Sequence, residues 1–504
     1  MTSLSPSPLP SAPPPAACPG PLVRRTRYQV TALAALILLL PACGCRTRTP
    51  FQPPAFPAPA AWRTPSAPGT APDLAWWEFY RDPTLVRLVR TALDQNQDLL
   101  IAAARIEEAQ AGYRSRRSAL FPEANASAGW TRARSGLTQA TGSQFDVLGL
   151  LSYEVDLWGR LRRLSDAARA ELLSAEETRR ALQLSLVSQV ASTYFQLHAL
   201  DAQLDVAHRT LESRSASFEL TRIMFDDGEG IVSELDVRQA ETQVHAARSS
   251  IAGLHRALAL TENALSQLLG NPPGSIPRGI ALAQQPVPET PPPGLPSELL
   301  LRRPDVRAAE QALAAAHANI AAARAAYFPT LSLTAALGLQ STDLDDLFDP
   351  GLSRTWRFAP QVAGPIFNAG RIRAGVAATR AREKAALASY SQAIQNAFRE
   401  VDDALASVAY LRDQLEADVA AAAAERARLE LSRLRYQGGV DDYSDVLDAE
   451  RFLFNAELQA IQTRSDLLTG LAQLYKALGG GWNPPPATGT ELPFPSPSST
   501  PPSP

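Results

Sequence analysis

LWGRLRR at residues 157–163 returns as NAGRIRA at residues 368–374, and the rest of the chain repeats in the same way. Phe121-Pro122 ends one Ala-rich helical pattern, and Phe328-Pro329 ends a second. Three further pairs keep nearly the same spacing: Asp98 with Asp305, Ala240-Glu241 with Ala449-Glu450, and Leu269-Gly270 with Leu478-Gly479. All five offsets lie between 207 and 211 residues. So small a drift predicts two copies of one structural unit, in which a single copy need not bury its apolar face alone.

Each copy is predicted to run helix, two strands, very long helix, turn, helix. The first helices are expected from about Thr84 to Leu120 and from about Pro304 to Tyr327. After each Phe-Pro pair the apolar period changes from 3.6 to 2, which indicates strands. These strands are expected around residues 124–130, 145–157, 331–337 and 356–362. Pro360 weakens the last assignment, because proline cannot donate to a strand ladder.

The absence of proline marks the long helices, because proline is excluded from helix interiors. Residues 123–271 and 366–483 contain none. Helices are predicted over about 160–225 and 371–436, each ~100 Å long at 1.5 Å per residue. Gly-rich turns follow them, and antiparallel partners return over about 233–269 and 442–478. Helices of this length form coiled coils or tubes rather than compact domains.

The N-terminus is typical of a lipoprotein signal peptide covering residues 1–42. Arg24, Arg25 and Arg27 precede an apolar run over 30–40, and Leu40-Pro41-Ala42-Cys43 forms a lipobox. Eleven apolar residues are too few for a membrane anchor, which needs ~20. We therefore expect N-acyl and S-diacylglycerol groups on Cys43, with Cys45 as the weaker alternative site. The Pro/Ser-rich start is unusual for a signal peptide and places an alternative start near residue 23. Gly44 after Cys43, rather than Asp, indicates the outer membrane.

Composition argues against several function classes. The net charge of −3 gives no indication of nucleic-acid binding. All three cysteines lie in the first 45 residues, and the five histidines form no ligand spacing, so neither a disulfide framework nor a metal site is expected. No nucleophile elbow or phosphate-binding loop is present. We expect no catalytic residues, and no cofactor beyond the covalent lipid.

Four alternating strands per chain in an outer-membrane lipoprotein predict part of a transmembrane β-barrel. Outer-membrane barrels need at least eight strands, and lipid does not tolerate open sheet edges. The barrel must therefore be shared between two, three or four copies, and the pattern alone does not choose among them. The long helices are expected to continue as a hollow bundle reaching ~100 Å into the periplasm.

Several segments resemble the TolC-like outer-membrane factors, in the lipoprotein branch that includes OprM and NodT. The segments that carry this resemblance start at Trp76 (WWEFYRDPTLVRLVRTALDQNQDLLIAAARIEEA), Tyr153 (YEVDLWGRLRR), Gly294 (GLPSELLLRRPDVRAAE), Gly364 (GPIFNAGRIRA), Arg435 (RYQGGVDDYSDVLDAER) and Tyr475 (YKALGGGW). The resemblance implies a mainly α, internally duplicated chain with four strands, and a homotrimer that shares a twelve-stranded transmembrane β-barrel and a periplasmic α-barrel. It also implies a periplasmic adaptor (a membrane fusion protein) and an inner-membrane pump, commonly of the resistance-nodulation-division type.

The same resemblance implies functional residues at the periplasmic tip. Asp445 and Asp448 match the family's gate motif, and threefold symmetry would stack them as two acidic rings. The alternative is a solvated helix start, where the helix dipole favours acids. Some members hold the gate with an Arg at the position of Asp441, so that salt bridge is not expected here. The turns at Gly228, Gly230, Gly438 and Gly439 match adaptor-contacting tips, or are plain helix breaks.

The predicted organisation is therefore a signal peptide (1–42), a lipidated extended N-terminus (43–82), a first repeat (83–270), a linker (271–298), a second repeat (299–482) and a Pro-rich disordered tail (483–504). The predicted function is the passive outer-membrane exit duct of a tripartite efflux pump. The alternatives are an exit channel for type I protein secretion and a structural coiled-coil envelope lipoprotein. An envelope enzyme is disfavoured, because no reactive constellation appears. The cargo is left open among drugs, metals, other small molecules and protein.

Overall fold

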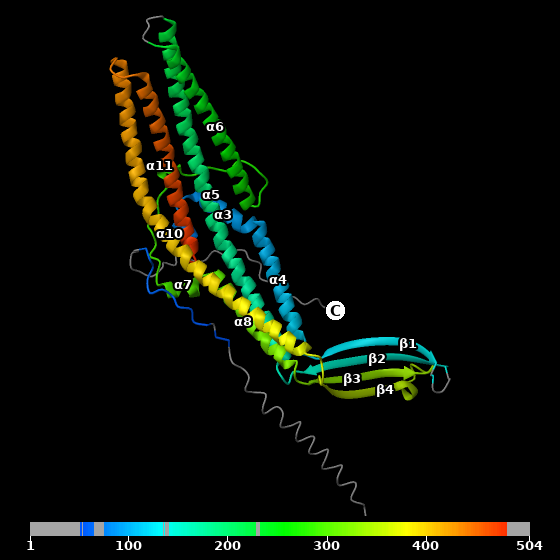
Figure 1. Cartoon of the computed structure of the whole chain (residues 1–504). Coiled ribbons are helices and arrows are strands. Elements are labelled where there is room, and N and C mark those ends of the chain that lie inside the picture. The colour runs from blue at the N-terminus through cyan, green and yellow to red at the C-terminus, as the bar shows by residue number, and fades with distance from the viewer. Residues whose placement is uncertain are drawn as a thin grey trace, which may run out of the picture. The chain divides into compact units, whose positions relative to one another are not determined.

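The computed structural model describes residues 51–52, 54–64, 75–134, 136, 141–227 and 232–480. Within it the chain forms two units. A sheet unit comprises Leu120–Arg160 and Ala325–Asn368, and a helical unit comprises most of the remaining described residues. The sheet is thus assembled from the middle of each sequence repeat, and the helices come from the flanking parts (Figure 1).

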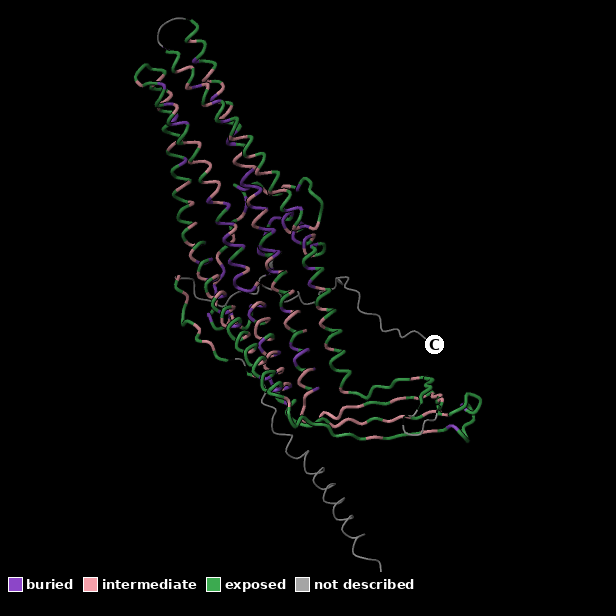
Figure 2. Tube along the Cα trace, turned by 45° about the vertical axis from the view of Figure 1, so that its right-hand side comes forward, coloured by how far each residue is buried: buried purple, intermediate pink, exposed green. Residues whose placement is uncertain are grey.

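The duplication predicted from the sequence is confirmed in the lengths of the helices. Three pairs match: α4 (Gln97–Ser118) and α8 (Pro304–Ala325) have 22 residues each, α5 (Arg160–Asp226) and α10 (Arg371–Gln437) have 67, and α6 (Glu234–Leu268) and α11 (Tyr443–Ala477) have 35. At 1.5 Å per residue the long helices measure ~100 Å, as expected. Figures 1 and 2 show the two hairpins, α5 with α6 and α10 with α11, side by side. None of the helices in the described ranges is long and apolar enough to cross a membrane.

The first helix of the chain is broken where one continuous helix was expected. Helix α3 (Pro83–Gln95) ends at Asn96, whose backbone is extended with ψ 127°. The Asn96 side chain then caps α4 by accepting from the backbone N–H groups of Asp98 and Leu99. Its amide also donates to the carbonyl of Leu268, at the end of α6. The prediction of one helix was wrong because a side-chain cap can close one helix and open another within a single residue.

The second repeat has the same break. Helix α7 (Pro296–Arg302) ends at Arg303, which follows Asn96 by the same 207-residue offset. Arg303 donates to the carbonyl of Ala477, at the end of α11, and pairs with Asp305 and Glu400. In each repeat, the residue between the first two helices, Asn96 or Arg303, therefore donates a hydrogen bond to the end of the last helix. Figure 2 shows buried residues concentrated in the middle of the helical unit, where these ends meet.

The segment between the repeats is mostly irregular, as predicted, but it is tightly anchored. It holds only a short 3-10 helix, η1 (Leu282–Gln284), before α7. Arg278 pairs with Asp201 of α5 at 2.9 Å and with Glu262 of α6 at 2.6 Å. Arg464 of α11 donates to the carbonyls of Leu282 and Gln285. The linker thus carries polar contacts to helices of both repeats.

The sheet has four antiparallel strands in the order β1-β2-β3-β4. They are β1 (Glu123–Arg134), β2 (Thr141–Val155), β3 (Thr330–Ser341) and β4 (Arg354–Ala363), with a one-turn helix α9 (Pro350–Ser353) before β4. All four predicted strands are confirmed. Pro360 does lie within β4, opposite Leu333, and β4 is an outer strand of this sheet, where proline is tolerated.

Candidate pore lining and helical tip

The sheet has one apolar and one largely polar face, set by its register. Residues directly opposite each other in neighbouring strands share a face. Trp130 lies opposite Phe145, Val147 opposite Leu339, and Leu337 opposite Trp356. This first face carries Ala124, Ala126, Ala128, Trp130, Phe145, Val147, Leu151, Tyr153, Leu331, Leu333, Leu337, Trp356, Phe358 and Val362. The second face carries Glu123, Asn125, Ser127, Thr131, Gln144, Asp146, Ser152, Glu154, Ser332, Thr334, Gln340, Thr355, Arg357 and Gln361, interrupted by Leu148 and Leu150.

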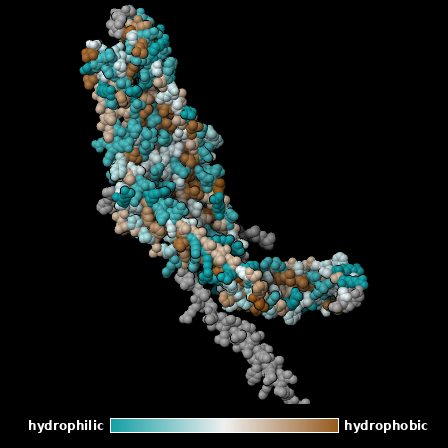
Figure 3. Space-filling view, in the orientation of Figure 1, coloured by the Kyte–Doolittle hydropathy of each residue, from teal (hydrophilic) through white to brown (hydrophobic). Residues whose placement is uncertain are grey.

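The apolar face is left uncovered by the residues that the structure describes. Trp130 is 62% exposed, Trp356 74% and Val362 68%. In Figure 3 apolar side chains gather along the middle of the sheet, and hydrophilic ones lie at its loop end. A band of large exposed apolar side chains beside a polar face is the pattern of a membrane strand that faces lipid on one side and a wet lumen on the other.

The turn between α10 and α11 forms the tip that the sequence predicted. Gly438 caps α10, and Gly439 has a φ of 70°, a left-handed conformation that glycine adopts without strain. The N–H of Val440 then returns to the carbonyl of Arg435. Arg435 also closes the turn through its side chain, with Nη2 at 2.7 Å from Oδ1 of Asp441. This hydrogen bond and the charge of Arg435 lower the pKa of Asp441.

Asp445 and Asp448 lie one helical turn apart at the start of α11, and both are exposed. The residues that follow them, Val446 and Ala449, are buried, so the two acids lie beside the packed stripe of the helix. Asp448 pairs with Arg451 at 3.0 Å, whereas the Asp445 side chain makes none of the described hydrogen bonds or ion pairs. The geometry therefore leaves Asp445 open to a partner outside the chain, whereas Asp448 is exposed but already contacts Arg451.

The first repeat treats its corresponding acid differently. Asp236 stands where Asp445 stands, 209 residues earlier, and it forms a capping box with Ser233. Its carboxylate accepts from the Ser233 backbone N–H at 2.9 Å and from the hydroxyl at 2.7 Å. In the second repeat the cap is Asp442, whose side chain makes no capping hydrogen bond. Asp236 thus takes part in capping its helix, a role that Asp445 does not have.

A packed core lies directly behind the tip acids and holds the four long helices together. Its buried residues are Ala240, Leu429, Tyr443, Val446 and Ala449. Glu450, only 5% exposed, accepts from Arg433 of α10 at 2.7 Å and from Ser213 of α5. Beside it, burial lowers the pKa of Arg214, while the charge of Glu450 opposes that shift. Helices α5, α10 and α11 are therefore joined by charged contacts at the level of the acids.

The structure does not place every predicted site residue. Cys43, Gly228 and Gly230 lie outside the described residues, so lipid attachment and the first tip stay predictions. The gate role of Asp445 and Asp448 and the adaptor contact at Gly438 and Gly439 likewise stay predictions. The ion-pair partners of the tip residues Asp441 and Asp448 were also not predicted from the sequence. Arg451 could have been found, because it is the i+3 neighbour of Asp448. Asp441 was considered only as a position where some family members have an arginine, and its ion pair with Arg435 was not predicted. Glu450 was used only as a repeat marker, because nothing local distinguishes it from the half-buried Glu241.

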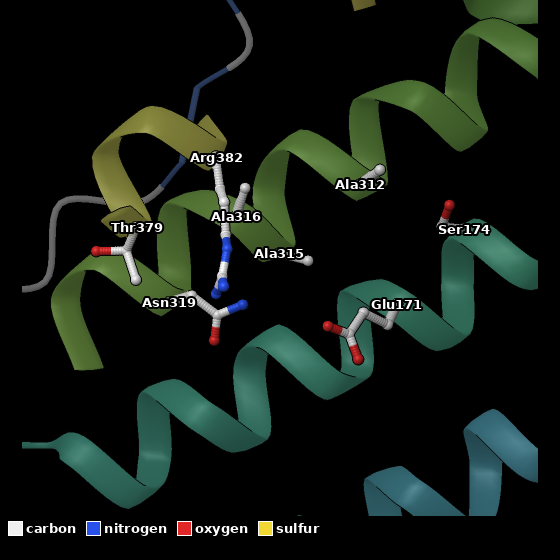
Figure 4. Close-up of a pocket in the computed structure, with 8 residues that line it drawn as sticks. All are labelled: Glu171, Ser174, Ala312, Ala315, Ala316, Asn319, Thr379 and Arg382. Atoms are coloured by element: carbon white, nitrogen blue, oxygen red, sulfur yellow. The ribbon is translucent and has the colours of Figure 1, made fainter. Parts of the chain in front are cut away.

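A separate hollow of about 320 Å³ lies in the helical unit between α5, α8 and α10 (Figure 4). Ala312, Ala315 and Ala316 of α8 form its small-residue wall. Polar side chains border it: Glu171, Ser174, Asn319, Thr379 and Arg382. Figure 4 shows Arg382 directed toward Asn319. The short alanine side chains explain the hollow, because they leave space between helices that larger residues would fill.

Comparison with known proteins decides the family. The model of a family described as "outer membrane efflux protein" matches twice, over residues 88–271 and 295–480. The chain belongs to this family. The solvent efflux pump outer membrane protein SrpC of Pseudomonas putida is 42% identical over 472 residues, covering 91% of this chain and 99% of that protein. The cation efflux system protein CusC of Escherichia coli is 37% identical, covering 88% and 98%.

Solved structures agree. A membrane protein from Pseudomonas aeruginosa has a TM-score of 0.80 at 37% identity, covering 86% of this chain and all of that one. The open state of the MtrE outer membrane channel of Neisseria gonorrhoeae has a TM-score of 0.79 at 35% identity, covering 87% and 98%. The resemblance to TolC-like factors, the duplicated mainly α fold with its four strands, and the location in the outer membrane are confirmed. The chain is an outer-membrane efflux protein, as its sequence predicted.

Proposed function

We propose that this chain is the passive exit duct of a tripartite efflux pump and works as a homotrimer. The observation that carries this proposal is the two-faced sheet. Its apolar band is exposed, and the outer edges of β1 and β4 pair with no other strand of the described residues. Four strands cannot close around a lumen, and open edges are not tolerated in lipid. Three copies give twelve strands, which is the number that the family resemblance implies. The polar faces then line the lumen, and the apolar faces meet the lipid.

The helices of three copies supply twelve walls of a periplasmic tunnel. Asp445 and Asp448 of each copy form two acidic rings that close it at rest. Their exposure, and the freedom of Asp445 from the capping role that Asp236 plays, support this assignment. The tips at Gly228, Gly230, Gly438 and Gly439 meet the hairpin of a periplasmic adaptor, a membrane fusion protein. That adaptor connects the duct to an inner-membrane pump of the resistance-nodulation-division type.

The N-terminus anchors the duct to the outer membrane. Residues 1–42 are removed as a signal peptide, and Cys43 receives the N-acyl and S-diacylglycerol groups. Residues 43–82 then lead to the first repeat (83–270), the linker (271–298), the second repeat (299–482) and the tail (483–504). The duct carries out no chemical step and needs neither metal nor cofactor, since diffusion through a lumen makes and breaks no bond.

The inner-membrane pump sets the cargo. The names of similar proteins support this, because they differ in cargo while the sequences stay similar. Relatives named for toluene, antibiotic and cation efflux are 42%, 38% and 37% identical to this chain. A lumen lined by hydroxyl and amide groups, such as those of Ser127 and Gln361, offers no specific pocket for any of these cargoes.

The first test is the native mass of the protein extracted in detergent from outer-membrane vesicles. A species of three processed chains, each lighter than the 54.1 kDa of the full 504-residue sequence, that conducts ions in a planar bilayer is expected. A monomer, or a protein recovered in the soluble fraction, would return the chain to the coiled-coil spacer alternative.

A further inference from the structure

The two outer strands of the sheet are open edges that a second copy of the chain can pair. Beyond β1 and beyond β4 no further strand lies within the described chain (Figure 1). Each edge therefore presents backbone N–H and C=O groups that need a partner in lipid. The proposed trimer supplies that partner but does not by itself say which residue meets which.

The internal duplication holds this information, because it is kept in register. Glu123 pairs with Ser152, and their counterparts Thr330 and Ala363 also pair. Trp130 pairs with Phe145 just as Leu337 pairs with Trp356. The shift from repeat one to repeat two is therefore constant, at 207 residues for β1 to β3 and 211 for β2 to β4.

The same two shifts can be applied to the pairing of β2 with β3. That pairing joins the second strand of repeat one (β2) to the first strand of repeat two (β3). A pairing of β4 with β1 of a neighbouring copy would likewise join the second strand of one repeat to the first strand of another. Leu151 pairs with Ala335. The counterpart of Leu151, 211 residues later, is Val362, and the counterpart of Ala335, 207 residues earlier, is Ala128. The repeat therefore predicts that Val362 of one copy lies opposite Ala128 of the next.

The faces of the sheet provide an independent check on this register. Val362 and Ala128 both belong to the apolar face, and their neighbours Gln361 and Gly129 both belong to the opposite face. A slip of one residue would bring every apolar side chain of β4 beside a lumen residue of the neighbour. Only slips by an even number of residues keep the faces matched, and the smallest of these place Val362 opposite Ala126 or Trp130.

The loops at the helix-proximal ends of the strands point to the same junction. Within the chain, the loop after β2 covers the start of β3, where Trp158 stacks on Phe328 at 4.6 Å and its ring N–H donates to the carbonyl of Pro329. The matching start of β1 has no such cover, and Phe121 is 61% exposed. In the matching loop after β4, Ala369 stands at the position of Trp158, and the large apolar side chains available there are Ile366, fully exposed, and Phe367, 88% exposed.

We infer that β4 of one copy pairs with β1 of the next with Val362 opposite Ala128, and that Ile366 and Phe367 then cover Phe121-Pro122 of that neighbour. This inference rests on the proposed shared barrel and adds its residue-level junction. The occupant is a second copy of this chain, because its β1 and β4 edges are complementary in register, in face and in their exposed loops.

Disulfide cross-linking tests the register, because directly opposite residues lie about 4.5–5.5 Å apart and diagonal ones about 7–8 Å, beyond disulfide reach. The double variant Ala128→Cys/Val362→Cys is made in the full lipoprotein with Cys45→Ser, so that Cys43 stays for acylation. Two slipped controls carry Ala126→Cys or Trp130→Cys with Val362→Cys. An intrachain control, Leu151→Cys/Ala335→Cys, reports whether the oxidant reaches this depth of the sheet.

After oxidation in membranes, Ala128→Cys/Val362→Cys should shift the chain to covalent dimers and trimers that dithiothreitol returns to monomer. The slipped controls should stay monomeric in denaturing gels. Cross-linking of a slipped pair instead, or of no pair while the intrachain control oxidises, in protein whose native mass is that of a trimer, would overturn the inferred junction and leave the proposed duct standing. A monomeric native mass for unmodified protein would remove both.

Discussion

Tyr194 donates a hydrogen bond from its hydroxyl to Oδ2 of Asp82, 2.7 Å away, across 112 residues of sequence. The same carboxylate, only 1% exposed, also accepts from the Thr84 N–H, the Ile280 N–H and the Gln285 amide. One buried acid therefore joins the start of the first repeat, the long helix α5 and the linker between the repeats. Burial of a charge is tolerated here because hydrogen bonds satisfy it.

Asp82→Ala should lower the thermal stability of the helical unit strongly. It leaves the buried hydroxyl of Tyr194 and the amide of Gln285 without this acceptor, at a cost of about 1–3 kcal/mol for each buried donor left unpaired. Circular dichroism melts in detergent would show a lower midpoint. Tyr194→Phe removes one of the four donors to Asp82 and the acceptor of the Gly279 N–H, and it should have a smaller effect. The exposed Asp94→Ala should stay within about 0.5 kcal/mol of the parent. Equal midpoints for the Asp82 and Asp94 variants would contradict this role.

The same site predicts a pH dependence. Burial by itself raises the pKa of Asp82, but hydrogen bonds from Gln285, Tyr194 and two backbone N–H groups outweigh it and lower the pKa below its usual 3.8. A carboxyl with a depressed folded pKa stabilises the fold above its unfolded pKa, and this contribution is lost as pH falls through the folded value. Melting midpoints should therefore drop more steeply below about pH 4 in the parent than in Asp82→Asn. If the melting midpoints of the parent and of Asp82→Asn fall in parallel with pH, Asp82 is not a source of this pH dependence.

Neighbouring residues of β1 should respond in opposite ways to arginine. Ala128→Arg places a charge on the lipid face, where arginine near the membrane midplane costs about 2–4 kcal/mol. Ser127→Arg places the same charge on the lumen face of the same strand. We expect less trimer in the outer membrane for Ala128→Arg, and normal assembly with altered ion selectivity for Ser127→Arg. The reverse result would invert the assignment of the two faces.

The elements of this fold were predictable to the extent that their signals are local. Period and proline content predicted the strands and both 67-residue helices, and the repeat offsets predicted the duplication. The break at Asn96 was missed because an asparagine within a helical pattern reads as a weak helix former until its contact with Leu268 is known. Buried Glu450 was missed for a similar reason, because its partners Arg433 and Ser213 come from other helices. The acids Asp445 and Asp448 were found only through the family motif, since spacing alone fits a solvated helix start equally well.

Removal of the proposed acylation site should change where the protein is found. Cys43→Ala is expected to abolish incorporation of labelled palmitate and to mislocalise the protein in membrane fractionation. Cys45→Ala keeps the lipobox Leu40-Pro41-Ala42-Cys43 intact and should behave like the parent. Labelling that survives in Cys43→Ala and disappears in Cys45→Ala would move the processing site by two residues.

Replacement of both tip acids should loosen the resting duct. Asp445→Ala/Asp448→Ala removes six carboxylates from a trimer, together with the contact of Asp448 to Arg451. Like charges held close repel, so a closed ring of acids needs bound cations, raised pKa values or tight packing to stay shut. Without the rings, those closing contacts are lost, and single-channel conductance in planar bilayers should rise. Asp442→Ala is the matched control, since it removes an adjacent exposed acid whose side chain makes no capping bond. If the double variant conducts like the parent, these acids do not form the gate; if Asp442→Ala opens the duct as much, general tip charge rather than the two rings controls it.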